Sequence, residues 1–161
     1  MVLQNFPFAD RITISQKSGI AKEDIPMIHV IMGLKGSGKT KKLIDAIHNA
    51  VAEAHGDVVC IEYGRKLTYD VTYKVRLVDS KEYAINSPEM LKGFLSGLHA
   101  GNFDITNVFI DNLYKTIGDD KAAGEEFVAW CAKFAADNNM EITMTISEDP
   151  AEASEEIKKY L

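Results

Sequence analysis

The chain has 161 residues, a length typical of one domain, with 46% hydrophobic and 26% charged residues. This composition excludes a long disordered chain, a collagen-like fibre and a small disulfide-stapled scaffold. No apolar run approaches the roughly 18 residues that a membrane span needs, and the N-terminus lacks the basic and apolar regions of a secretory signal. We therefore expect a cytoplasmic protein with no membrane partner.

The net charge of −6 is unevenly distributed along the chain. Residues 117–161 contain eleven acidic residues and four lysines, whereas Lys35, Lys39, Lys41 and Lys42 lie within eight residues of one another. The acidic C-terminal part argues against broad nucleic-acid binding, which requires a basic face. The lysine cluster favours one localised anion site. A protein partner or an oligomer stays open.

The first 26 residues are net neutral and show no clear hydrophobic period. We expect them to form an N-terminal arm or an added strand beside a single domain over residues 27–161. Ile12 and Ile14 alternate with polar residues, which is typical of a short strand. An ordered strap over the domain is an equally good interpretation.

From Met27 onward, buried strands alternate with amphipathic helices. Strands are predicted at 27–32, 58–63, 107–111 and 141–147, and helices at about 39–54, 87–101 and around 127–135, with a short C-terminal helix after Asp149-Pro150. The alternation in residues 71–77 predicts a more exposed strand or hairpin arm within 64–86. Strands that alternate with helices of this length predict an α/β fold with a mainly parallel sheet covered on both faces.

One glycine-rich segment matches the pattern G-x-x-x-x-G-K-[ST] in full, between a predicted strand and a predicted helix. Its residues are Gly33, Leu34, Lys35, Gly36, Ser37, Gly38, Lys39 and Thr40. Glycines let the backbone turn tightly and approach phosphate oxygens, and the loop N–H groups and the helix N-terminus favour an anion. Lys39 supplies a charge to the β- and γ-phosphates, and the Thr40 hydroxyl is suited to Mg²⁺.

On these residues the chain resembles the P-loop NTPase superfamily. The resemblance implies a three-layer α/β P-loop domain of about five strands that binds ATP or another nucleoside triphosphate with Mg²⁺. It places the nucleotide on residues 33–40 and on Lys41. Lys35 lies four residues before Lys39, not five as in the partition ATPases, so we interpret it as a loop charge near phosphate.

The acid that ends a hydrophobic strand in this superfamily holds the metal, and Asp111 after Val108-Phe109-Ile110 matches it. Many such ATPases have a glutamate next, but here the residue is Asn112, which is no general base. In the RecA-like branch the glutamate instead ends the strand after the first helix. Glu62 fits that position and is the candidate to polarise water, with Lys39 as the second catalytic residue.

The order of elements over about residues 27–147 is similar to the thymidine-kinase type of P-loop fold, without its zinc cysteines.

From the glycine-rich loop, Asp111 and Glu62 we expect slow Mg²⁺-dependent ATP hydrolysis. The alternatives are a regulatory module that binds nucleotide without useful turnover and a small-molecule kinase with residues 64–86 as its lid. We interpret Arg65 as a surface residue in preference to a phosphate ligand, and we expect His29 to be a core histidine.

Overall fold

The computed structural model describes residues 27–161, and the predicted arm or strand at 1–26 lies outside them. It contains one sheet of five parallel strands in the order β1-β5-β4-β2-β3. The strands are β1 (Ile28–Met32), β2 (Asp57–Glu62), β3 (Val75–Asp79), β4 (Ile105–Ile110) and β5 (Glu141–Ile146). The expected α/β class with a parallel sheet of about five strands is confirmed.

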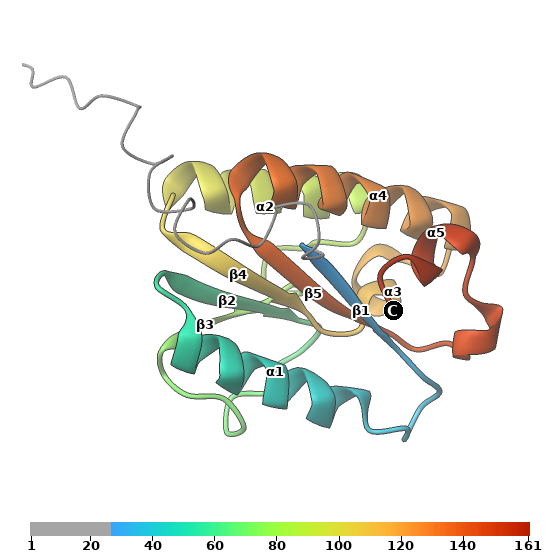
Figure 1. Ribbon diagram of the computed structural model, residues 1–161, viewed down its shortest axis with the longest axis horizontal. Helices are drawn as coiled ribbons and strands as arrows, with labels where there is room; N and C mark the ends of the chain where they lie inside the picture. Colours follow the sequence, from blue (N-terminus) through green and yellow to red (C-terminus); the bar gives the residue numbers. More distant parts are fainter. Residues whose placement is uncertain (1–26) are drawn as a thin grey trace, which may run out of the picture.

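Helices cover both faces of the sheet (Figure 1). One face packs against α1, and the other packs against α2 and α4. The helices are α1 (Lys39–Glu53), α2 (Pro88–Gly101), α3 (Leu113–Ile117), α4 (Lys121–Asn138) and α5 (Glu155–Lys158), with a 3₁₀ turn at Pro150–Glu152. None of the helices in this part of the chain is long and apolar enough to cross a membrane.

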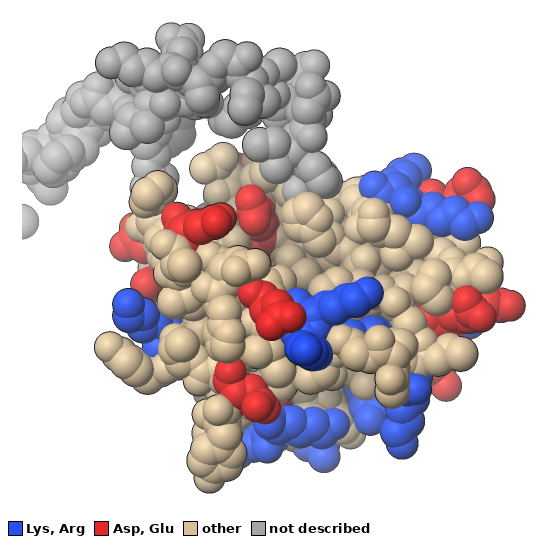
Figure 2. Space-filling view, turned by 60° about the horizontal axis from the view of Figure 1, so that its bottom comes forward, with Lys and Arg blue, Asp and Glu red and all other residues tan. Residues whose placement is uncertain are grey.

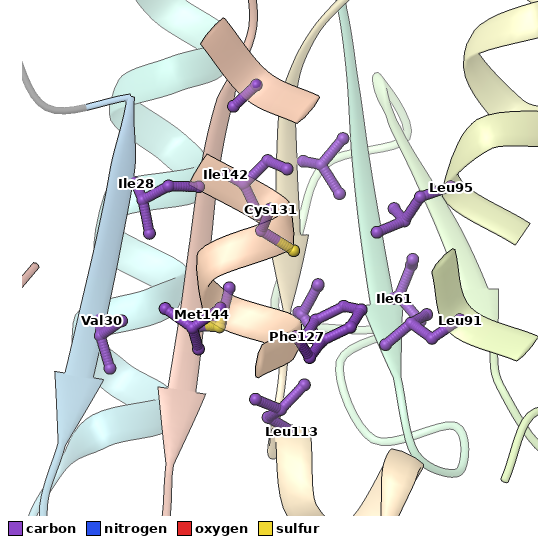
Figure 3. Packing of buried hydrophobic residues seen from close by; sticks show 14 of the residues in the cluster. Ile28, Val30, Ile61, Leu91, Leu95, Leu113, Phe127, Cys131, Ile142 and Met144 are labelled. Carbon is purple, nitrogen blue, oxygen red and sulfur yellow. The ribbon is translucent and has the colours of Figure 1, made fainter. Parts of the chain in front are cut away.

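Alternation along the strands divides the core into two clusters. Val59 and Ile61 of β2 pack toward α2 and α4, where Phe127 is fully buried (Figure 3). Cys60 of the same strand points the other way and packs with Leu43 and Ile47 of α1. Because side chains two residues apart share a face, the alternation along each strand also fixes the face on which the residue after the strand lies.

The predicted elements agree with the structure to within a few residues, except in two places. Only the last part of the predicted segment 71–77 belongs to a strand, β3, which runs to Asp79, pairs in parallel with β2 at the sheet edge and is not an arm of a hairpin. The short helix α3 follows Asn112 directly and was not predicted. Five residues are too few for an amphipathic period to stand out in a sequence.

Candidate functional site

The glycine-rich loop (residues 33–40) joins the carboxyl end of β1 to the first turn of α1. Gly36 and Gly38 adopt φ values of 83° and 87°, a region that L-residues rarely occupy. At Gly33 a Cβ atom would collide with the Ser37 hydroxyl, so the glycine is needed for space. The local backbone and packing therefore require glycine at the two positions that the pattern fixes, Gly33 and Gly38, and also at Gly36.

Lys39 is folded back over this loop. Its Nζ donates to the carbonyl oxygen of Leu34 at 2.9 Å, and the residue is buried. Gly38 is the N-cap of α1 and provides no side-chain cap, and the first turn of the helix has no acidic residue. The first N–H groups of α1 and the Lys39 ammonium thus both present positive charge at this loop. An anion bound there would be stabilised.

Four polar residues lie in one row across the carboxyl ends of the neighbouring strands. Glu62 is in register with Asp79, and the Asp111 N–H donates to the Ile61 carbonyl oxygen at 2.8 Å. Thr145 is one residue beyond Met144, which pairs with Ile110. Because side chains alternate along a strand, all four point to the face of the sheet that α1 covers. The glycine-rich loop leads directly into this helix.

Thr145 holds Asp111 in place. The Thr145 hydroxyl donates to Asp111 Oδ1 at 3.0 Å and accepts the N–H of Asn112 at 2.7 Å. Both Asp111 and Thr145 are buried, at 8% and 1% exposure. Asn112 has a φ of 54°, so the chain turns sharply after the acid. The sequence analysis missed Thr145, because a threonine within an apolar strand is an ordinary strand residue.

The second carboxylate oxygen of Asp111 accepts no hydrogen bond from any residue within 27–161. Mg²⁺ prefers oxygen ligands and is commonly held by one or two carboxylates together with waters and substrate phosphates. Asp111 and the exposed Thr40 at the start of α1 offer such ligands. No cluster of three or more metal-ligating side chains occurs in the described chain, so a metal here would depend on phosphate and water ligands.

Glu62 lies in the row, and one of its two carboxylate oxygens is bound by the backbone. Glu62 Oε2 accepts the N–H groups of Lys66 and Leu67 at 2.8 and 2.9 Å, and the residue is 2% exposed. It therefore caps the turn that follows β2. The sequence analysis foresaw the position of Glu62 but not this pairing, because the return of the chain at residues 66–67 has no distinctive pattern.

Asp79 plays a similar part at the sheet edge. Its Oδ1 accepts the N–H groups of Gly64 and Lys81 at 2.9 and 3.0 Å. Two of the three acids in the row thus stabilise loop backbone, each through one carboxylate oxygen, whereas Asp111 accepts its one hydrogen bond within the described residues from a side chain. The acids also affect their surroundings, since burial, followed by the charges of Glu62 and Asp111, raises the pKa of the Cys60 thiol.

The remaining predicted residues lie at the surface or elsewhere. Lys35 and Lys41 are exposed at the glycine-rich loop and the first turn of α1. Arg65 forms an exposed ion pair with Glu82, beyond β3. His29 is half-buried and borders a small cavity at the amino ends of the strands, so it is not fully enclosed in the core. Cys60 and Cys131 are free and buried.

Charge on the α1 side of the molecule is mixed. Figure 2 shows basic and acidic side chains interspersed over this side, with no continuous basic track. A basic track is what non-specific binding to a nucleic-acid backbone requires. The positive charge at the glycine-rich loop is therefore a local feature.

Comparison of the sequence with protein-family models finds no matching family, and comparison with curated proteins finds no match.

The Thr145 bridge generates a stability prediction. Thr145→Val removes the hydroxyl, leaves the Asn112 N–H buried without its acceptor and frees Asp111. We expect the free energy of unfolding in urea to fall by about 1–3 kcal/mol. Thr143→Val is the matched control, because Thr143 is buried on the same strand face and its hydroxyl bonds no described residue. Equal changes in the two variants would contradict the bridge.

Proposed function

We propose that this protein binds a nucleoside triphosphate, with ATP the first candidate, together with Mg²⁺, and hydrolyses it slowly. The single observation that carries the proposal is the glycine-rich loop, with its left-handed Gly36 and Gly38 and with Lys39 folded over the loop carbonyl of Leu34. Such a loop at the start of a 15-residue helix presents backbone donors and a mobile cation to phosphate.

Phosphate binding would exchange one Lys39 contact for another. The Nζ atom now donates to a neutral carbonyl, and a phosphate oxygen is a stronger, charged acceptor. The loop would change little, because Gly33, Gly36 and Gly38 already allow the tight backbone conformation that a turn around phosphate requires. A binding loop formed in advance loses less conformational entropy on binding.

The metal would lie between the phosphates and Asp111. The Thr40 hydroxyl and the Asp111 carboxylate would hold the hydrated cation, directly or through water. Thr145 would keep the carboxylate in one orientation, as hydrogen-bonded partners do for metal ligands. The metal would supply charge neutralisation at the β- and γ-phosphates, which is its main role in phosphoryl transfer.

The state of Glu62 favours slow turnover and also supports a second candidate function. The two N–H groups that Glu62 Oε2 accepts fix the orientation of the carboxylate, so only Oε1, which accepts no hydrogen bond from residues 27–161, is left to act as a general base. If the two bonds keep Oε1 away from the attacking water in the complex, the protein is a regulatory module that binds nucleotide without useful turnover. A kinase role gains no support, because Arg65 is paired with Glu82.

The first functional prediction concerns Lys39. Lys39→Ala removes the ammonium that would contact phosphate, with each charge-assisted bond worth roughly 1.5–3 kcal/mol, so ATP affinity should fall by at least tenfold. Lys42→Ala is the control, since Lys42 is an exposed lysine three residues further along α1. Isothermal titration calorimetry measures both. Lys39→Ala binding within twofold of wild type would refute the phosphate loop.

A second prediction separates metal from phosphate. Asp111→Asn keeps the size of the side chain and its bond with Thr145 but removes the charge. ATP affinity should fall by about tenfold or more with Mg²⁺ present and change little with EDTA, because the carboxylate acts on the cation. Equal losses under both conditions would identify Asp111 as a purely structural acid.

A third prediction distinguishes the two candidate functions at Glu62. Gln retains a carbonyl oxygen that can accept from Lys66 and Leu67 but is no base. If Glu62 moves to the water, Glu62→Gln should leave ATP affinity nearly unchanged and lower turnover by about 10²- to 10⁴-fold. If wild type binds ATP and releases no phosphate above the background of Lys39→Ala, the regulatory module is correct. Wild-type turnover in Glu62→Gln would exclude Glu62 as the base.

A further inference from the structure

A cleft lies at the opposite end of the sheet from the glycine-rich loop. It has a volume of about 890 Å³ and opens between α2 and the edge of the sheet formed by β2 and β3. Asp57 and Ile105, the first residues of β2 and β4, mark its position at the amino ends of the strands. Nothing in the proposed nucleotide site reaches this cleft.

The cleft has an apolar floor and a cationic wall. Its floor is formed by Val59 of β2 and by Phe94 and Leu98 of α2. Lys74 and Arg76 line the β3 side, and neither forms an ion pair with an acid in residues 27–161. Arg76 lies on this face because it pairs with Val59, which points toward α2, and Lys74 lies in the turn that directly precedes β3.

The one acid that lines the cleft is already engaged. Asp57 Oδ2 accepts the side-chain N–H of Asn102 at 2.7 Å, and Asn102 is the C-cap of α2. Asp57 therefore fastens the end of the helix to the start of β2. Asp57 keeps its charge, so the lining carries two cations and one carboxylate, and its net positive charge favours an anionic group on whatever fills the cleft.

Three glycines of α2 make the cleft deep. Gly93, Gly97 and Gly101 line it at four-residue intervals, and a Cβ atom at any of them would meet nothing within 4 Å. No side chain therefore projects into the cleft from these three positions of α2, and the space in front of them is open. A volume of about 890 Å³ lies within the range of sites for small organic ligands, which are mostly apolar with a few polar groups that fix orientation.

We propose that this cleft binds an amphipathic organic anion, whose apolar body lies on Phe94 and Leu98 against the bare face of α2 and whose carboxylate, sulfonate or phosphate group meets Lys74 and Arg76. The ligand is a small molecule, because the charged groups stand on one wall of a cleft of ligand size. The site is separate from the nucleotide site, so either can fail without the other.

A pair of fluorescent probes tests the proposal on the full chain. The anionic probe is 1-anilinonaphthalene-8-sulfonate, and its neutral counterpart, N-phenyl-1-naphthylamine, has the same aromatic body without the sulfonate. Wild type should bind the anionic probe more tightly. The double variant Lys74→Gln/Arg76→Gln should lose about tenfold in affinity for the anionic probe, and its affinity for the neutral probe should stay within twofold.

A variant that fills the cleft provides a second test of the proposal. Gly97→Leu projects a side chain into the open space and should weaken both probes by at least tenfold, while its unfolding midpoint stays at or above that of wild type because Leu favours helix more than Gly does. Ala100→Leu is the matched control, since Ala100 is an exposed residue of α2 outside the cleft lining and should leave binding unchanged.

Three results would overturn the proposal. They are the absence of anionic-probe binding by wild type, unchanged binding by Gly97→Leu, and equal weakening of both probes when Lys74 and Arg76 are neutralised. The last would indicate an apolar docking surface for a protein. Lys39→Ala should bind the anionic probe as wild type does, so failure of this site is distinguishable from failure of the nucleotide site.

Discussion

The parallel register of the sheet is the constraint on which the candidate site depends. Because all five strands run the same way, every strand ends at the edge where the glycine-rich loop begins. The side-chain period of two then turns Glu62, Asp111 and Thr145 to the α1 face together. A slip of one residue in any strand would move its polar residue to the opposite face and into the larger apolar cluster around Phe127. Core packing and site geometry are therefore specified by the same alternation.

Within that row, hydrogen bonding gives the acids different roles. Bonds to a charged acceptor are worth roughly 1.5–3 kcal/mol each, so the two backbone bonds to Glu62 hold its carboxylate firmly on the turn at residues 66–67. Asp111 instead accepts one hydrogen bond, from the Thr145 side chain, and none from the backbone of the described residues. An acid that holds the backbone of a turn and an acid that is held only by a side chain have different roles, although each simply ends an apolar strand in the sequence.

Local patterns predicted most of the fold and part of the site. The glycine-rich loop was visible because its residues are adjacent, and Asp111 because an acid after a buried strand stands out. Thr145 could not be found this way, since its role arises from the insertion of β5 between β1 and β4, a long-range pairing. The capping role of Glu62 depends on the chain returning at Leu67, and β3 was recognised as a strand but not as a parallel one. In each case the missing information is a contact between segments far apart in sequence.

The anchoring of Glu62 also explains how the nucleotide loop and the water-activating position would communicate. Leu67, whose N–H bonds Glu62, is buried in the same cluster as Leu43 and Ile47 of α1. Releasing Glu62 without moving Leu67 would leave a buried N–H without a partner, at about 1–3 kcal/mol. Leu43 lies one turn beyond Lys39, so α1 joins the glycine-rich loop to the cluster that contains Leu67. Under the proposed function, this packing is a physical connection through which a bound nucleotide would act on Glu62.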